Sequence, residues 1–418
     1  MKTTVSEPDV CKRVIEFEIP VEEYSAAFDR KVDEYRRDVR LPGFRPGKVP
    51  VNVIKQRFGD AAKAAVIEDL VKDSYKTACD EHNIVPVSEA KLTDMNEDEG
   101  KPLRFTIETE VDPPIEITGY DKLKITPKIK KLKDSDVEEN FQNLLERFAE
   151  FTDVDRASKK GDYVRIEYRR VTIDGAERPD IQSPGYPFEV GAANALKEFD
   201  KGLTGVSAGE EVEITVKFPK DYSDPGAAGK TGEFSITVSS VQEKRLPEMN
   251  EEFLKKLGDF KTVDALKEEI RKGMEESEAE RARKEAHAEA VDALIKANPF
   301  EVPQSKVEKF VDMMIEDYAQ GQGQGGGVAE SREELAERFK DAAVMALKRI
   351  RIVDFIADKE KIKATQEEVD KEIEIMALRY GRDFDEVKQV FRKNGTTNRL
   401  RLEIREKKTL DFLIGEGK

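Results

Sequence analysis

Tryptophan is absent from this 418-residue chain, and aromatic residues make up only 7% of it. So small a supply of large apolar side chains argues against a single large hydrophobic core. Hydrophobic residues still account for 38%, and the length allows about three domains of roughly 150 residues each. Charged residues also account for 38%, which is typical of proteins with long solvated helices.

Cysteine and histidine are also scarce. Cys11 and Cys79 are too few for a disulfide framework and lack metal-ligand or redox spacing, so we expect a reducing compartment. His82 and His287 are isolated, which supports neither a metal site nor a nucleophile–base pair. With no phosphate-binding P-loop either, we expect a protein that uses no cofactor, metal ion or ATP.

Long apolar runs are missing as well. Residues 1–8 have no apolar core of the kind that forms a signal peptide. No stretch approaches the ~20 apolar residues of a membrane span. We therefore expect a soluble, cytoplasmic protein with no membrane partner.

One glycine-rich run matches a nucleotide-binding pattern in sequence but lacks the structural context that the pattern requires. Gly321-Gln322-Gly323-Gln324-Gly325-Gly326 has the dinucleotide-binding spacing, but it follows a predicted helix and no strand–helix–strand unit surrounds it. We expect a helix–helix loop at residues 320–327. The sequence leaves open whether it is a hinge or a tolerated insertion.

The distribution of charge points to one specific partner. The formal net charge of −16 argues against general nucleic-acid binding. Between Arg30 and Arg57, however, nine basic residues face three acidic ones, so 9 − 3 gives a local charge of +6. A cationic patch on an anionic protein indicates a polyanionic partner, although a solvated helix face is the ordinary explanation of such a run.

Apolar periodicity predicts an α+β multidomain protein. Residues 15–19 and 103–111 alternate as strands. One helix is predicted over 24–39, and several more are predicted from the loop to about residue 83. A capping box of Ser135 and Glu138 predicts a linker helix. Period-two patterns over 164–168, 212–218 and 234–238 predict a small β domain. Beyond residue 246 the pattern is helical, with one long helix over 262–298 and capping boxes at Ser331/Glu334 and Thr365/Glu368.

The loop between the first two helices combines stiffness with exposed recognition groups. Prolines 42, 46 and 50 restrict the backbone, while Gly43 and Gly47 permit tight turns. Phe44 can bury its ring in a partner, and Arg45 and Lys48 can contact phosphate or carboxylate. By residue chemistry alone, an ordinary helical hairpin turn fits equally well.

The segment Gly-Phe-Arg-x-Gly-x-x-Pro, on a helix–loop–helix after an N-terminal strand, resembles the ribosome-docking signature of the bacterial trigger factor family. The order of predicted segments and the Leu246-Pro247-Glu248 junction are similar to that family over essentially the whole chain. The resemblance implies a ribosome-binding domain at residues 1–113, a helical linker at 114–155, an FKBP-like β domain at 156–245 and an elongated all-helical chaperone domain at 246–418.

The same resemblance implies the function. It predicts an ATP-independent chaperone that binds nascent and unfolded chains at the ribosomal exit tunnel and keeps them open for folding or export, with a link to cell division. Its docking residues on protein and RNA of the large ribosomal subunit would be Gly43, Phe44, Arg45, Pro46, Gly47 and Lys48. Whether the free protein forms a homodimer is left open.

The middle domain resembles the FKBP-type peptidyl-prolyl isomerases. The resemblance places the isomerase pocket at six residues, some of which could equally be core: Tyr168, Phe188, Leu196, Phe199, Tyr222 and Phe234. The chain departs from the family pattern at Arg169-Arg170, at Lys197-Glu198 and at Arg178-Pro179-Asp180. We expect isomerase activity to be retained, with a reduced rate or a binding-only domain as the alternatives.

The helical region is expected to supply weak, dispersed contacts to clients. Its candidate contributors fit core packing equally well: Phe310, Met313, Met314, Ile352 and Phe355. Two other functions are alternatives: a stand-alone FKBP-type isomerase acting on released substrates, and a periplasmic chaperone with an embedded isomerase domain. The lack of a signal peptide in residues 1–8 weighs against the second.

Overall fold

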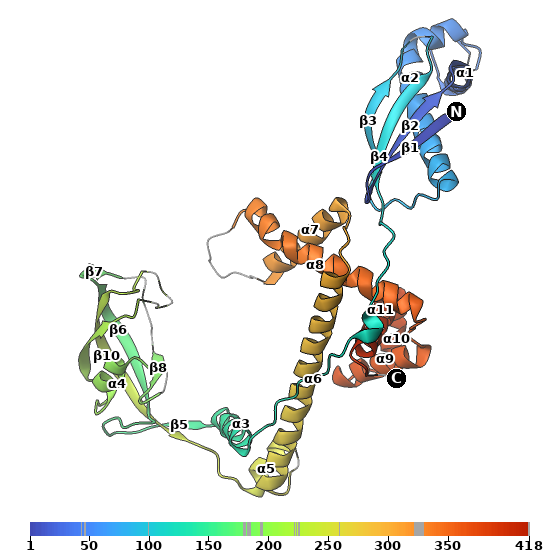
Figure 1. Cartoon of the computed structure of the whole chain (residues 1–418). Coiled ribbons are helices and arrows are strands. Elements are labelled where there is room, and N and C mark those ends of the chain that lie inside the picture. The colour runs from blue at the N-terminus through green and yellow to red at the C-terminus, as the bar shows by residue number, and fades with distance from the viewer. Residues whose placement is uncertain are drawn as a thin grey trace. The chain divides into compact units, whose positions relative to one another are not determined.

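The computed structural model divides the chain into two compact units, Met1–Lys128 with Ala282–Lys418, and Ile129–Arg281 (Figure 1). The residues that it describes are 1–42, 44–45, 47–98, 100–178, 181, 185–192, 195–220, 222, 224, 226–258, 260–321 and 330–416. Among these residues, no helix is both long enough and apolar enough to cross a membrane.

The first unit begins with a four-stranded antiparallel sheet in the order β1-β2-β4-β3. Its strands are β1 Lys2–Asp9, β2 Lys12–Ile19, β3 Lys91–Asn96 and β4 Leu103–Glu110. Phe17 and Phe105 are paired across β2 and β4, and their rings stack with centroids 4.7 Å apart. Apolar alternation predicted β2 and β4 but missed β1 and β3. Neither missed strand has a fully buried side chain: β1 alternates only between exposed and half-buried residues at its start, and β3 is exposed throughout.

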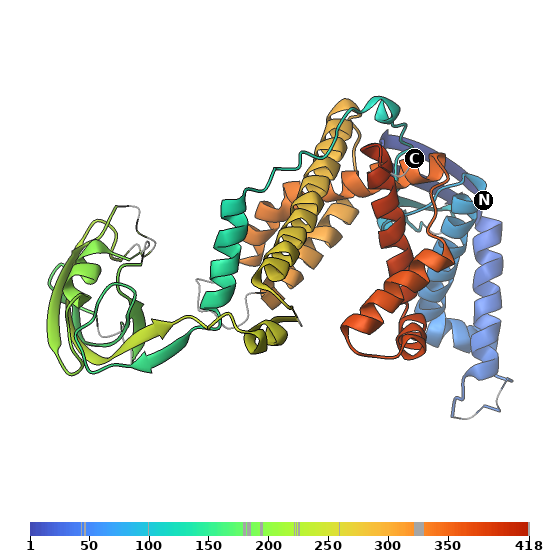
Figure 2. The ribbon, with the colours of Figure 1, turned by 90° about the horizontal axis from the view of Figure 1, so that it is seen from below.

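Two helices, α1 Val21–Asp38 and α2 Val51–Glu81, lie side by side and are joined by the glycine–proline loop (Figures 1 and 2). The part of α2 near its C-terminus covers the sheet through Ala78, whereas its first turns share a separate core with α1 that contains Val32, Val49 and Ile54. The prediction of several helices after the loop was wrong. α2 is continuous over 31 residues, since nothing in its sequence interrupts the hydrogen bonding.

The remaining regular elements described in the first unit are helices. After the 3₁₀ turn η1 Tyr120–Lys122 it contains α7 Gln304–Gly321, α8 Arg332–Lys359, α9 Gln366–Arg379, α10 Phe384–Lys393, α11 Thr396–Leu413 and the C-terminal part of α6 Val263–Ala297. The capping boxes at Ser331 and Thr365 are confirmed. Gly395, at φ +79°, separates α10 from α11.

The second unit is built on a curved antiparallel sheet with the path β5-β10-β6-β7, to which β8 adds beside β6 and β9 beside β10. Its strands are β5 Glu150–Asp153, β6 Tyr163–Ile173, β7 Ala176–Glu177, β8 Tyr186–Glu189, β9 Glu211–Lys217 and β10 Thr231–Arg245. The short helix α4 Lys197–Leu203 lies in the concave side of this sheet (Figure 2). Phe199 and Leu203 of α4 belong there to the same core as Ile236.

The second unit also contains α3 Asp134–Glu146 and α5 Glu251–Gly258, which pack on the first turns of α6 through Phe141, Leu254 and Leu266. The capping box predicted for α3 was wrong. The helix begins at Asp134, and the Asp136 carboxylate accepts the backbone N–H of Lys133 at 2.9 Å. Because the helix starts earlier than predicted, Ser135 lies inside its first turn and does not cap it.

Candidate functional site

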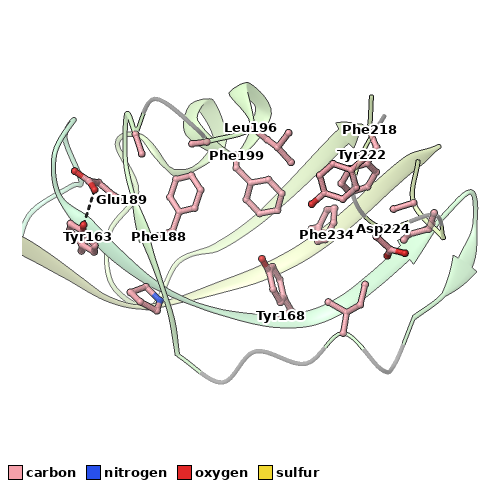
Figure 3. Close-up of a pocket in the computed structure, with 16 residues that line it drawn as sticks. Tyr163, Tyr168, Phe188, Glu189, Leu196, Phe199, Phe218, Tyr222, Asp224 and Phe234 are labelled. Atoms are coloured by element: carbon pink, nitrogen blue, oxygen red, sulfur yellow. Dashed lines mark hydrogen bonds between the residues drawn. The ribbon is translucent and has the colours of Figure 1, made fainter. Parts of the chain in front are cut away.

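Six apolar and aromatic side chains from distant parts of the second unit line one cavity of about 550 Å³. They are the six that the sequence predicted for a pocket: Tyr168 on β6, Phe188 on β8, Leu196 just before α4, Phe199 on α4, Tyr222 after β9 and Phe234 on β10. Figure 3 shows these side chains converging between α4 and the sheet.

The rings of this pocket pack in a fixed pattern. Phe199 and Phe234 meet edge to face with centroids 5.0 Å apart, and the centroid of the Tyr168 ring lies 5.7 Å from that of Phe234. Phe199 and Phe234 are only 6% and 7% exposed, whereas Tyr222 is 36% exposed. Phe199 and Phe234 therefore form the floor of the pocket, and Tyr222 forms part of its rim.

Part of the lining was not predicted from the sequence. The further residues are Tyr163, Ile173, Ile181, Pro187, Glu189, Ala192, Ala195, Phe218, Asp224 and Ala227. Phe218 was visible only as the last member of the period-two run over 212–218, where it served as evidence for a strand. In the structure its ring centroid lies 4.7 Å from that of Tyr222, so Phe218 supports the rim.

One edge of the pocket is polar. The Tyr163 hydroxyl donates a hydrogen bond of 2.7 Å to Glu189 Oε2, and Lys244 Nζ lies 3.5 Å from the other carboxylate oxygen. Burial, followed by the bond to Glu189, raises the pKa of Tyr163 to about 12. Tyr163 therefore stays a neutral hydrogen-bond donor at physiological pH.

Two of the three departures from the isomerase pattern lie outside the cavity. The Arg169 and Arg170 side chains are 63% and 66% exposed. The pairing of β6 with β10 shifts between Tyr168 and Arg170, which makes Arg169 the extra residue of a β-bulge. Lys197 and Glu198 occupy the exposed first turn of α4. None of these four charged side chains lines the pocket.

The third departure is only partly described. Pro179 and Asp180 lie outside the described residues. Arg178 Nη1 lies 3.9 Å from Asp224 Oδ2, and Asp224 Oδ1 accepts the backbone N–H of Gly226 at 2.8 Å. Asp224 therefore places a carboxylate at the end of the pocket near Tyr222 (Figure 3).

The loop between α1 and α2 exposes the recognition groups expected of it. Phe44 is 42% exposed, and Arg45 and Lys48 are not buried, whereas Val49 is fully buried in the core between the helices. Gly47 adopts φ +76°, and the Lys48 N–H donates to the Arg45 carbonyl at 3.0 Å in a tight turn. Gly43 and Pro46, which the sequence also predicted for docking, lie outside the described residues.

Most of the basic side chains around this loop lack acidic partners. Lys31, Arg36 and Lys55 form ion pairs with acidic side chains of α1 and α2. In the described part of the chain, the other six form none: Arg30, Arg37, Arg40, Arg45, Lys48 and Arg57. The loop and its surroundings therefore carry free positive charge beside one exposed aromatic ring.

Comparison with known proteins adds an independent observation. Residues 1–144 match the model of "Bacterial trigger factor protein (TF)", residues 262–415 match that of its C-terminus, and residues 154–239 match "FKBP-type peptidyl-prolyl cis-trans isomerase". The chain is 33% identical to the trigger factor of Koribacter versatilis over 97% of its own length and 94% of that protein. It is 31% identical to the trigger factor of Marinobacter nauticus over 100% of its length and 96% of that protein.

A solved structure has the same fold. The structure described as "Promiscuous Substrate Recognition in Folding and Assembly Activities of the Trigger Factor Chaperone" covers 100% of both chains with a TM-score of 0.53 at 24% identity.

Proposed function

The chain belongs to the bacterial trigger factor family, and we propose that its loop docks on the ribosome while its aromatic pocket isomerises prolyl bonds. The protein is a ribosome-associated chaperone with an FKBP-type peptidyl-prolyl isomerase domain. The stand-alone isomerase is not favoured, because the family match also includes the N- and C-terminal regions. We assign ribosome docking to residues of the loop between α1 and α2, and prolyl isomerisation to residues of the aromatic pocket.

The proposal for docking rests on one observation: Phe44 is exposed at a tip whose supporting side chain, Val49, is fully buried. An aromatic ring that stays exposed in its own chain is suited to burial in a partner. Arg45 beside it presents a planar donor group that can bind phosphate bidentately. We assign the loop of Gly43, Phe44, Arg45, Pro46, Gly47 and Lys48 to contacts with protein and RNA of the large subunit.

The pocket can isomerise a prolyl bond without acid–base chemistry. Rotation about the peptide bond has a barrier of about 18–20 kcal/mol, because the amide is stabilised by resonance. Walls made by Phe199, Phe234 and Phe188 exclude water from the bound amide. They favour the twisted state, because an amide that has lost its resonance is less polar than a planar one. The pocket therefore acts by binding the transition state more tightly than the ground state. Among the described departures, Arg169, Arg170, Lys197 and Glu198 do not line the cavity, which supports retained activity.

Client contacts are assigned to apolar and aromatic side chains exposed on the helices of the first unit and at the C-cap of α9. These are Met313, Met345, Ile350, Ile375, Leu378, Tyr380, Val390 and Leu402. Ile352 is fully buried, so it is core, while Met313 is 56% exposed. Phe310, Met314 and Phe355 are partly buried against cores of this unit. Weak contacts spread over several side chains, methionines among them, suit clients of varied sequence, because no fixed pocket is required.

The proposal also covers the domain boundaries, the cellular location and the oligomeric state. The domain boundaries are 1–113, 114–155, 156–245 and 246–418, as the sequence suggests. A cytoplasmic location agrees with Cys11 and Cys79 both being free thiols. A homodimer of the free protein would cover part of the exposed apolar surface, and analytical ultracentrifugation tests it.

The experiment for docking is co-sedimentation with ribosomes. We expect the double variant Phe44→Ala/Arg45→Ala to lose binding. The matched control is Leu92→Ala on β3, since Leu92 is 45% exposed and Phe44 is 42% exposed. If the double variant sediments with ribosomes as well as the control does, the loop is not the docking element.

A further inference from the structure

Two carboxylates and a thiol meet where the sheet of the first unit approaches the segment between α6 and α7. Cys11 Sγ and one carboxylate oxygen each of Asp9 and Glu301 all lie within 4.8 Å of one another. Asp9 ends β1, Cys11 lies in the turn before β2, and Glu301 lies between α6 and α7. Glu301 is far from the other two in sequence, so only the fold brings the three together.

The thiol is the unusual member of this cluster. Cys11 is 7% exposed, and its sulfur has no hydrogen-bond partner among the described residues. Asp9 and Glu301 are exposed, and neither forms an ion pair within the described part of the chain. The cluster therefore collects negative charge around a buried sulfur. The nearby Arg13 guanidinium donates to the backbone carbonyl of Asp9 and pairs with Glu7, so among the described residues no basic side chain pairs with either carboxylate of the cluster.

The surrounding structure holds these groups in place. The Cys11 N–H donates to Asp9 Oδ1 at 2.8 Å, and the Val111 N–H donates to the Cys11 carbonyl at 2.9 Å. Beyond β4, Asp112 pairs with Lys306 of α7 at 2.7 Å. Glu110 Oε2 accepts the Ser305 hydroxyl at 2.6 Å. The β1–β2 turn and the segment that carries Glu301 are thus both fastened to the end of β4.

We propose that Asp9, Cys11 and Glu301 form a site for one divalent cation of borderline softness, with Zn²⁺ the best match. One thiolate and two carboxylates are ligands that Zn²⁺ accepts, at about 2.3 Å for sulfur and 2.0–2.2 Å for oxygen. Tetrahedral bonds of those lengths put ligand atoms roughly 3.5 Å apart. The present separations need to close by about 1 Å, which the two exposed carboxylate side chains allow.

The charge of the cation fits this location. Burial, with smaller contributions from Asp9 and Glu301, raises the pKa of the Cys11 thiol to about 11. Zn²⁺ binds cysteine as the thiolate, so binding at this cluster would release the thiol proton. A bound cation would cross-link the β1–β2 turn to the segment between α6 and α7. The cation site shares no residue with the proposed docking loop or the isomerase pocket.

Co²⁺ in place of Zn²⁺ provides a direct test on the full-length, reduced protein. We expect one Co²⁺ per chain and a near-ultraviolet thiolate-to-cobalt charge-transfer band, which reports sulfur in the coordination shell. Zn²⁺ should displace Co²⁺ and abolish the band. Cys11→Ser should remove the band, while Cys79→Ser, which changes the other free thiol, should keep it.

Glu301→Gln provides the second arm, because Glu301 is exposed and its change does not threaten folding. We expect it to weaken Zn²⁺ binding, measured by competition with a chromophoric chelator, by at least about tenfold, as removal of one ligand should. Circular dichroism of each variant checks the fold. The proposal fails if the wild-type chain shows no charge-transfer band, or if Cys11→Ser binds Zn²⁺ as tightly as wild type.

Discussion

Phe199 of α4 and Phe234 of β10 meet edge to face, with ring centroids 5.0 Å apart and planes at 65°. The contact joins the helix to the sheet at the floor of the pocket. Aromatic pairs in this geometry contribute about 0.5–1.5 kcal/mol beyond the area they bury. The shape of the pocket therefore depends on how firmly these two rings are held by their neighbours.

Gly232→Ala should damage the pocket without changing any residue that lines it. An added Cβ at Gly232 would lie 2.8 Å from ring carbons of both Phe218 and Phe234, closer than real Cβ atoms approach their neighbours. Overpacking of this kind costs about 1–3 kcal/mol of unfolding free energy. Displacement of the two rings should lower kcat/KM for prolyl isomerisation by about tenfold or more.

A protease-coupled peptide assay and urea unfolding measure the two effects. Gly273→Ala is the matched control, because nothing lies within 4 Å of the Cβ that it would add in α6. The control should keep full isomerase activity. Unchanged activity of Gly232→Ala would show that the two rings do not shape the productive pocket.

Arg45→Ala should make ribosome binding both weaker and less sensitive to salt. Without the Arg45 guanidinium, fewer counterions leave the ribosomal RNA on binding, so the slope of log K against log salt should fall by about one. Arg104→Ala is the control, since Arg104 is 64% exposed on the same domain but pairs with Glu18 at 3.0 Å. An unchanged slope in Arg45→Ala would mean that Arg45 contacts protein alone or does not reach the ribosome.

Glu243 should contribute to stability in a pH-dependent way. Hydrogen bonds from Lys159, then Arg245 and Arg156, lower its pKa to about 2. A carboxyl whose pKa is lower in the folded state stabilises above its unfolded pKa of about 4.3. That contribution disappears as the pH falls from about 4.3 towards 2.

The test is urea unfolding of wild type and Glu243→Gln at pH values between 2 and 7. The difference in urea midpoint between the two proteins should be largest near neutral pH and should shrink as the pH falls from about 4.3 towards 2. Glu213→Gln, an exposed change on β9, serves as the control and should show no such trend. A difference that is constant with pH would contradict the assignment.

Ile352→Ala and Met313→Ala should separate packing from client binding. Ile352 is fully buried, so truncation should cost about 2–5 kcal/mol of unfolding free energy. Met313 is 56% exposed, and its truncation should change stability by less than about 0.5 kcal/mol. Suppression of aggregation of an unfolded client should nevertheless weaken in Met313→Ala. If Met313→Ala suppresses aggregation as well as wild type does, Met313 does not contact clients.

The strands that could be predicted from the sequence are those whose two faces differ in burial. β2 and β4 bury alternate side chains, and β9 does so near its end. β3 and β5 are exposed along their whole length, so no alternation marks them, and only pairing with a neighbour makes them strands. Helix caps are local at all three starts, yet only Ser331 and Thr365 were predicted correctly. At α3 the equally local bond from the Lys133 N–H to Asp136 begins the helix before the predicted Ser135.

Through its resemblance to the FKBP-type isomerases, the sequence by itself named six side chains that line one cavity of the structure. Through its resemblance to the trigger factor family it also predicted a docking role for the glycine–proline loop, which stays a prediction. Tertiary structure alone decided which apolar helix residues face solvent, as the contrast between Met313 and Ile352 shows. It also brought Glu301 to Cys11 and Phe218 to the rim of the pocket. The reason is physical: periodicity along a chain reports which side of its own element a residue occupies, but not what the fold places against that side.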